Sequence, residues 1–218
     1  MTRAVLADLG KVLVGFDHQV TCDRIAEATG IPAGRLRPVL FGDLEANFDR
    51  GRLTPHEFFR ACEEGAGLPR LPDSVWTGAW RDIFHPLPDA LAALSRIRPG
   101  IRRVLVSNTN ALHWEGVLRV FDPSGLFDAL VLSFQVGAVK PEGGFWDAAL
   151  AAARCAPGEC LYADDRPELV DAAAARGIPG FVVGRPGSFA AGLEECGLLE
   201  SLHAPTGNSR TGMTVPLS

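Results

Sequence analysis

The chain has 218 residues, of which 47% are hydrophobic and 22% charged, so it is expected to form one globular domain or a core domain with a smaller insert. Its net charge of −5 argues against non-specific binding to nucleic acid or to an anionic membrane surface. No apolar stretch is long enough to span a bilayer, and no secretory signal pattern opens the chain. We therefore expect a cytoplasmic protein.

The first predicted element is a buried strand over residues 4–9, a short apolar run that contains Asp8. Residues 15–85 then read as short amphipathic helices separated by glycine and proline. Trp76 and Trp80 are one helical turn apart, which is typical of residues in the core of such an insert. We interpret this segment as a small all-helical cap inserted after the first strand.

After the insert, helical and strand patterns alternate along the chain. The predicted helices cover residues 89–97, 145–155 and 169–177, and the predicted strands cover 102–108, 129–133, 159–165 and 180–184. This alternation indicates an α/β fold, a Rossmann-like parallel sheet flanked by helices. We expect a core of residues 1–14 and 86–203, a helical cap of residues 15–85 and a flexible tail of residues 204–218.

Two residue counts are also informative. The five cysteines are an odd number and form no C-x-x-C pair, which predicts reduced thiols that are mostly buried. Of the 21 basic residues only Lys11 and Lys140 are lysines, and the rest are arginines. A lysine kept in such a chain indicates a position that needs a compact ammonium group.

Polar residues stand at four element ends, where parallel sheets collect their ligands. They are Asp8, Ser107 with Asn108, Lys140, and Asp164 with Asp165. Each has an ordinary explanation as a turn or cap residue, but together they make a coherent chemical set. A carboxylate can attack phosphorus, two further acids can hold Mg²⁺, a hydroxyl and an amide can bind the transferring oxygens, and an ammonium can stabilise the negative charge.

The same residues lie in four motifs that resemble those of haloacid dehalogenase-like (HAD) hydrolases. The motifs are D-x-G-x-V-L at residues 8–13, L-V-S-N-T-N at 105–110, V-K-P-E at 139–142 and Y-A-D-D at 162–165. The helical insert resembles the cap that this superfamily carries after its first motif. The forms D-L-G and S-N-T-N-x-L-H are similar to those of bacterial phosphatases that act on sugar 1-phosphates.

The resemblance implies a role for each motif residue. Asp8 would be the nucleophile and Lys140 the group that stabilises its charge, while Ser107 and Asn108 would hold the phosphate. The expected function is a Mg²⁺-dependent phosphatase that hydrolyses a small phosphorylated metabolite through an aspartyl-phosphate, with a sugar phosphate as one candidate. No nucleic acid or membrane partner is expected, and the protein would be a monomer or a homodimer.

The implied metal site and two departures from the family pattern concern the same region. Mg²⁺ would be held by Asp8, the Gly10 carbonyl and Asp165, with Asp164 acting through water or as a support. The family's phosphatases usually carry an aspartate where this chain has Gly10, and that aspartate is their general acid and base. Leu169 stands where the family often has asparagine. The glycine removes a group that typically contributes about 10²–10⁴ in rate.

Several residues could replace the missing acid, and the sequence leaves the choice open. Lys11 would have to be buried, and His113 has a suitable charge range but stands early in a helix, where a structural role is common. Cap residues such as Asp17, His18 or Asp43 could reach the site when the cap closes.

Two other functions remain open at this point. The first is a dehalogenase in which Asp8 attacks carbon without a metal, although such a site gains little from the two further acids, Asp164 and Asp165. The second is a weakly active or inactive relative that binds a phosphorylated ligand, which the substitutions Gly10 and Leu169 keep open.

Overall fold

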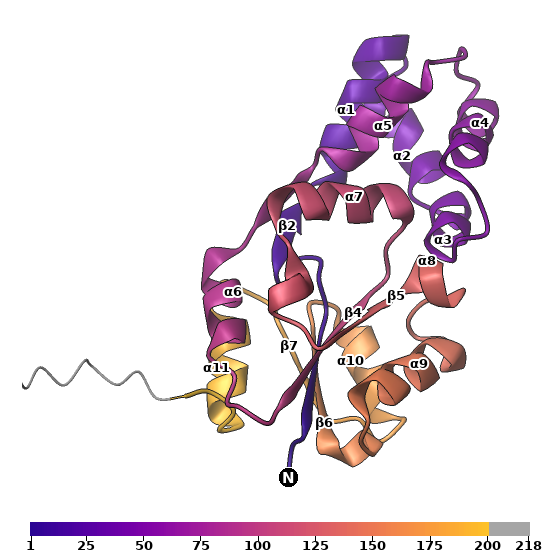
Figure 1. The fold of residues 1–218 in the computed structure, drawn as a ribbon. Coiled ribbons are helices and arrows are strands. Elements are labelled where there is room, and N and C mark those ends of the chain that lie inside the picture. The colour runs from indigo at the N-terminus through magenta and orange to yellow at the C-terminus, as the bar shows by residue number, and fades with distance from the viewer. Residues whose placement is uncertain (201–218) are drawn as a thin grey trace, which may run out of the picture.

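The computed structural model describes residues 1–200, and a five-stranded parallel sheet forms its centre (Figure 1). Its strands are β1 (Ala4–Ala7), β4 (Arg102–Ser107), β5 (Ala129–Leu132), β6 (Cys160–Asp164) and β7 (Gly180–Val182). They lie in the order β5-β4-β1-β6-β7, so β1 is central, with β4 and β6 as its neighbours. All five predicted strands are confirmed, each somewhat shorter than predicted. The predicted tail, residues 204–218, lies outside the described residues.

Helices cover both faces of this sheet, as predicted for an α/β Rossmann-like fold (Figure 1). Successive strand residues point to opposite faces, so Leu6 packs with one hydrophobic cluster and Val5 with another. The Leu6 side is covered by α9 (Gly143–Ala153) and α10 (Pro167–Ala174). The Val5 side is covered by α6 (Pro88–Ser95), α7 (Ala111–Val120) and α11 (Ser188–Glu195). A short helix, α8 (Ser133–Val136), follows β5.

Two expectations from the composition concern the cysteines and the helices. All five cysteines are free thiols, and three of them, Cys22, Cys62 and Cys160, are buried. Among the described residues, no helix is long and apolar enough to cross a membrane.

Five helices lie between β1 and the rest of the core and form a separate group above the sheet (Figure 1). They are α1 (His18–Thr29), α2 (Ala33–Leu40), α3 (Asp43–Asp49), α4 (Pro55–Ala66) and α5 (Asp73–Arg81). Their apolar faces share one hydrophobic cluster, in which Trp76 and Trp80 are fully buried, as predicted for the core of the insert. Leu112 of α7 is the one buried member of that cluster from outside these helices.

Two short strands that the sequence did not predict connect this helical group to the core. β2 (Val14–Phe16) and β3 (Phe84–Pro86) pair in antiparallel fashion, with Gly15 opposite His85. The expected insert boundaries, residues 15 and 85, fall within these two strands. The chain therefore leaves and re-enters the core through a paired ribbon, which fixes both ends of the insert beside each other.

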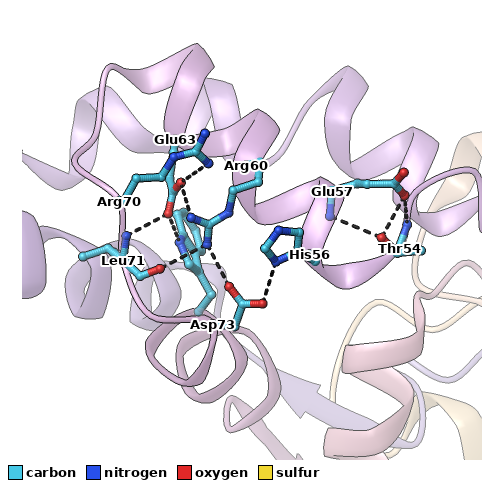
Figure 2. A network of polar contacts seen from close by, with 9 residues as sticks. Thr54, His56, Glu57, Arg60, Glu63, Arg70, Leu71 and Asp73 are labelled. Carbon is cyan, nitrogen blue, oxygen red and sulfur yellow. Dashed lines mark hydrogen bonds and ion pairs between the residues drawn. The ribbon is translucent and has the colours of Figure 1, made fainter.

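A buried carboxylate ties α4 to the loop before α5 (Figure 2). Glu63 is 3% exposed, and its two carboxylate oxygens accept hydrogen bonds from the Leu71 N–H at 2.9 Å and Trp76 Nε1 at 3.0 Å. The guanidinium groups of Arg60 and Arg70 lie 2.9 and 3.0 Å from the same carboxylate. Burial by itself raises the pKa of Glu63, but these hydrogen bonds and charges outweigh it and leave the pKa below its usual value.

We expect a Glu63→Ala variant to unfold more easily than the native protein by about 3 kcal/mol, because it leaves buried donors unpaired. Denaturant unfolding measures this loss. Because the pKa of Glu63 is lowered, its carboxylate stabilises the fold above the unfolded pKa of about 4.3, and this contribution is lost as the pH falls further. Glu64→Ala, at the exposed neighbouring position, is the control. Equal stabilities of the two variants at pH 7 would contradict the assignment.

Candidate active site

The first predicted site residue, Asp8, follows directly after the central strand β1. Its backbone N–H donates to the Ala163 carbonyl of β6 at 2.9 Å, which continues the sheet pairing by one residue. The Asp8 residue is 7% exposed. Because β4 and β6 flank β1, Ser107 at the end of β4 and Asp164 at the end of β6 lie at the same edge of the sheet.

Lys140 lies between two of the acids. Its Nζ is 2.6 Å from Asp8 Oδ1 and 2.7 Å from Asp164 Oδ2, and it also donates to the Val106 carbonyl at 3.2 Å. An ammonium group has three N–H donors, and these three acceptors match that number. Burial lowers the pKa of Lys140, but the charges of Asp8 and Asp164 outweigh that effect, so the net pKa is raised and the ammonium stays charged.

Asn108 holds the Lys140 backbone in place. Its side-chain amide accepts a hydrogen bond from the Lys140 N–H at 2.7 Å and donates one to the Lys140 carbonyl at 3.1 Å. The side chain that we expected to bind phosphate is therefore engaged in positioning the lysine. Ser107 differs, because its hydroxyl makes only a long contact of 3.4 Å with the neighbouring carbonyl of Asn108. The Ser107 hydroxyl is therefore freer than the Asn108 amide to bind a ligand.

Three carboxylates form a group that could hold a metal ion. Asp8, Asp164 and Asp165 each offer an oxygen, and these oxygens lie within 4.8 Å of one another. Asp164 is committed elsewhere, because Oδ2 accepts from Lys140 and the Tyr162 hydroxyl. Its Oδ1 accepts from a backbone N–H, and this arrangement suits the supporting role better than direct ligation. Hard carboxylate oxygens from Asp8 and Asp165 suit Mg²⁺.

The electrostatics of this edge are set by burial. Burial raises the pKa of Asp8 to about 7, and the Lys140 ammonium only partly offsets it. Burial and the neighbouring Asp164 also raise the pKa of Asp165. A cation beside Asp8 and Asp165 would favour their charged forms, since opposite charge lowers a carboxyl pKa. The acids therefore fit a divalent ion electrostatically as well as chemically.

A cavity of about 430 Å³ lies over the sheet edge and contacts residues of the insert as well as of the core. The structure brings all of the predicted site residues to this one cavity, namely Asp8, Gly10, Ser107, Asn108, Lys140, Asp164 and Asp165. Lys11, the second lysine, and Leu169 also line it. The two lysines of the chain therefore line the same cavity.

The structure separates the five residues considered as replacements for the missing acid. Asp17 and Asp43 are exposed, and neither lines the cavity: Asp17 caps the start of α1, and Asp43 begins α3. Lys11 lines the cavity but is exposed, so the burial that its role requires is absent. His18 and His113 line the cavity, and burial lowers the pKa of His18 to about 4 and that of His113 well below its usual value. Both imidazoles are therefore neutral near pH 7.

Two acids that the sequence analysis did not consider also line the cavity. Glu45 and Asp49 lie on α3, one helical turn apart, so they share one face of that helix. Burial raises the pKa of Glu45 well above its usual value and that of Asp49 to about 6. The i, i+4 spacing was visible in the sequence, but it did not show that this face meets the core.

The space beside Gly10 is filled by an aromatic ring of the connecting ribbon. A Cβ placed on Gly10 would lie 2.8 Å from Cε1 of Phe16, which is closer than normal contact. An aspartate at this position would therefore require the Phe16 ring to move. The Phe16 ring thus occupies the space that an acidic side chain at position 10 would need.

Comparisons with known proteins define the class. Residues 73–178 match the haloacid dehalogenase-like hydrolase family. The match includes Lys140, Asp164 and Asp165, and it begins well after Asp8. Residues 73–178, just under half of the chain, thus resemble a HAD-like hydrolase domain.

Solved structures extend the likeness across most of the chain. A HAD-family enzyme from Bacteroides thetaiotaomicron is 23% identical with a TM-score of 0.75, over 85% of this chain and 95% of that one. The same enzyme has been solved in complex with magnesium and inorganic phosphate. An L-2-haloacid dehalogenase from Xanthobacter autotrophicus is 21% identical with a TM-score of 0.64, over 85% of this chain and 78% of the other. The fold, including the inserted helices, is that of HAD enzymes.

Proposed function

We propose that the protein is a Mg²⁺-dependent phosphatase that acts on a small phosphorylated metabolite through an aspartyl-phosphate on Asp8. The observation that carries the proposal is the position of Lys140 between Asp8 and Asp164, with Asp165 beside them at the base of the cavity. This arrangement combines a nucleophile, a fixed cation and two further acids at one point.

Each residue has a role that follows from its contacts. Lys140 holds Oδ1 of Asp8, which leaves Oδ2 to attack phosphorus. The same ammonium offsets negative charge as the nucleophile and the phosphoryl group approach each other. The Ser107 hydroxyl can donate to a transferring oxygen. The Asn108 amide holds the backbone of Lys140 in place.

Asp8, Asp165 and the Gly10 carbonyl would hold Mg²⁺. Asp164, which accepts hydrogen bonds from Lys140 and Tyr162, would have a supporting role. When bound, Mg²⁺ would neutralise charge on the phosphoryl oxygens and help orient the phosphate. A dehalogenase, which attacks a neutral carbon, gains nothing from this concentration of carboxylates. That difference favours phosphorus as the site of attack.

The cavity favours a small substrate. A volume of about 430 Å³ at the junction of insert and core suits a metabolite of the size of a sugar phosphate. A sugar phosphate joined through its anomeric carbon is one candidate, since its leaving group needs less protonation than an ordinary alcohol. The protein would act as a monomer or homodimer, without nucleic acid or membrane.

Hydrolysis of para-nitrophenyl phosphate with Mg²⁺ and with EDTA tests the proposal. We expect turnover with the metal and loss of nearly all of it when EDTA removes the ion, because charge neutralisation is then absent. Adding back Mg²⁺ should restore the rate. Release of halide from a haloacid without metal would favour the dehalogenase, and no turnover across a broad panel of phosphates would favour an inactive relative.

A further inference from the structure

The candidate site has no acid at position 10, where the resemblance to HAD phosphatases implies a general acid. Gly10 has no side chain, and the Phe16 ring occupies the space beside it. Transfer of a phosphoryl group from an alkyl ester leaves an alkoxide, which departs far faster when an acid protonates it. The insert supplies two acids on another wall of the cavity, Glu45 and Asp49.

Asp49 is held in a defined position by the core. Its Oδ1 accepts a hydrogen bond from Asn110 Nδ2 at 2.9 Å. Asn110 is itself buried and fixed, since its Oδ1 accepts the His113 N–H at 2.9 Å as the N-cap of α7. One carboxylate oxygen of Asp49 is thus anchored by the amide, and the residue lines the cavity.

The end of α3 is also seated directly on the core. Arg50, the next residue, donates to Glu142 Oε1 from both Nε at 3.0 Å and a terminal nitrogen at 2.5 Å. Gly51 lies so close to the Phe134 carbonyl that a Cβ there would be 2.3 Å from the oxygen. These contacts fix the position of Asp49 against the core, although the residue belongs to the insert.

The neighbouring His113 offers a polar atom to a ligand in the cavity. His113 is 7% exposed and lines the same cavity, and its Nε2 has no hydrogen-bond partner among the described residues. The ring is stacked against Trp80 with centroids 5.1 Å apart, so it cannot turn freely to find one. A buried polar atom without a partner is costly, and a ligand hydroxyl or water in the cavity would satisfy it.

We propose that Asp49 is the general acid and base of this enzyme, in place of the side chain that Gly10 lacks. The inference rests on the proposed phosphatase function. In the first step an Asp8 oxygen bonds to phosphorus, the P–O bond to the leaving group breaks, and the proton of the Asp49 carboxyl passes to the leaving oxygen. In the second step the Asp49 carboxylate takes a proton from water, the water oxygen bonds to phosphorus, and the bond from phosphorus to Asp8 breaks.

The surroundings of Asp49 suit a group that exchanges a proton. Glu45 and Asp49 form a pair of buried acids whose pKa values are both raised, as is common for carboxyl groups that take part in proton transfer. Burial raises the pKa of Glu45 well above its usual value and that of Asp49 to about 6, so Asp49 can hold or release a proton near neutral pH. The Asn110 amide and Arg50, which follows α3, lower the pKa of Asp49, and Arg37 of α2 lowers that of Glu45. The imidazoles of His18 and His113 are neutral and add no charge.

An Asp49→Asn variant tests the inference through the leaving group. We expect kcat/KM for glycerol phosphate, an alkyl ester, to fall by about 10²–10⁴-fold, the typical contribution of a positioned acid. With para-nitrophenyl phosphate, whose leaving group needs no proton, kcat/KM should stay within a few-fold of the native value. Asp43→Asn, an exposed change on the same helix, is the control and should alter neither.

A pH profile provides a second readout. For glycerol phosphate, kcat/KM of the native enzyme should fall as the pH rises through about 6, because Asp49 loses the proton that it must donate. Asp49→Asn should remove this fall, and Asp49→Glu, which keeps a carboxyl group, should retain part of the alkyl-ester activity. Thermal unfolding shows whether each variant is folded.

The outcomes separate the two proposals. Equal losses on both esters in a folded Asp49→Asn variant, or no loss on either, would overturn the role of Asp49 while leaving the phosphatase function in place. Absence of turnover by the native enzyme on both esters would overturn the phosphatase function, and the role of Asp49 with it.

Discussion

An Asp8→Asn variant is expected to lose at least about 10⁴-fold in turnover of any phosphate ester, the scale seen when a catalytic nucleophile is removed. The amide oxygen is a poor nucleophile and cannot form the aspartyl-phosphate. The measurement is steady-state hydrolysis of para-nitrophenyl phosphate at saturating Mg²⁺. Asp171→Asn, an exposed substitution on α10, controls for the general effect of removing a carboxylate.

Stability measurements distinguish this loss from unfolding. Because burial raises the pKa of Asp8 to about 7, its ionisation destabilises the fold as the pH rises from the unfolded value of about 3.9 towards 7. The Asn variant has no such ionisation, so its free energy of unfolding in EDTA should fall less over this pH range than that of the native protein. A variant that kept substantial turnover while folded would exclude Asp8 as the nucleophile.

Replacing Lys140 by methionine is expected to reduce both activity and stability. Removal of one preorganised charged donor typically costs about 10²–10³-fold in kcat. The change also leaves the carboxylates of Asp8 and Asp164 buried without their cation, which should lower the free energy of unfolding by about 3 kcal/mol. Hydrolysis assays and denaturant unfolding measure the two effects separately.

The stability loss should depend on pH in a defined direction. Without the ammonium, the pKa of Asp8 rises further above its unfolded value, so the variant is penalised more as the pH increases from about 4. Lys11→Met is the natural comparison, since Lys11 is the other lysine and lies exposed at the same cavity. If Lys11→Met were as destabilising as Lys140→Met, the buried ion pairs would not be the cause.

The sequence by itself determined the sheet and where the candidate site residues stand along it. Short apolar runs, each followed by a polar residue, predicted the five parallel strands, because local hydrophobic pattern and strand length depend little on distant contacts. Because the carboxyl ends of parallel strands meet at one edge of the sheet, the sequence also predicts that Asp8, Ser107 and Asp164 lie close together. Their gathering at one cavity follows from topology.

Only the tertiary structure decided what each group has around it. Asn108 uses both atoms of its side-chain amide to hold Lys140, and Asp164 supports Lys140 and Tyr162, which no spacing in the sequence reveals. The ribbon of β2 and β3 was also missed, because strands of three residues carry too little periodicity to be recognised.

The proton donor is the clearest case. Asp49 is separated from Asn110 by 61 positions, and the two meet only because the end of α3 docks on the core through Arg50 and Gly51. A local pattern can show that Glu45 and Asp49 share a helix face, but not which surface that face meets. The sequence determined the candidate nucleophile, and long-range packing decided which acid of the insert lines the same cavity.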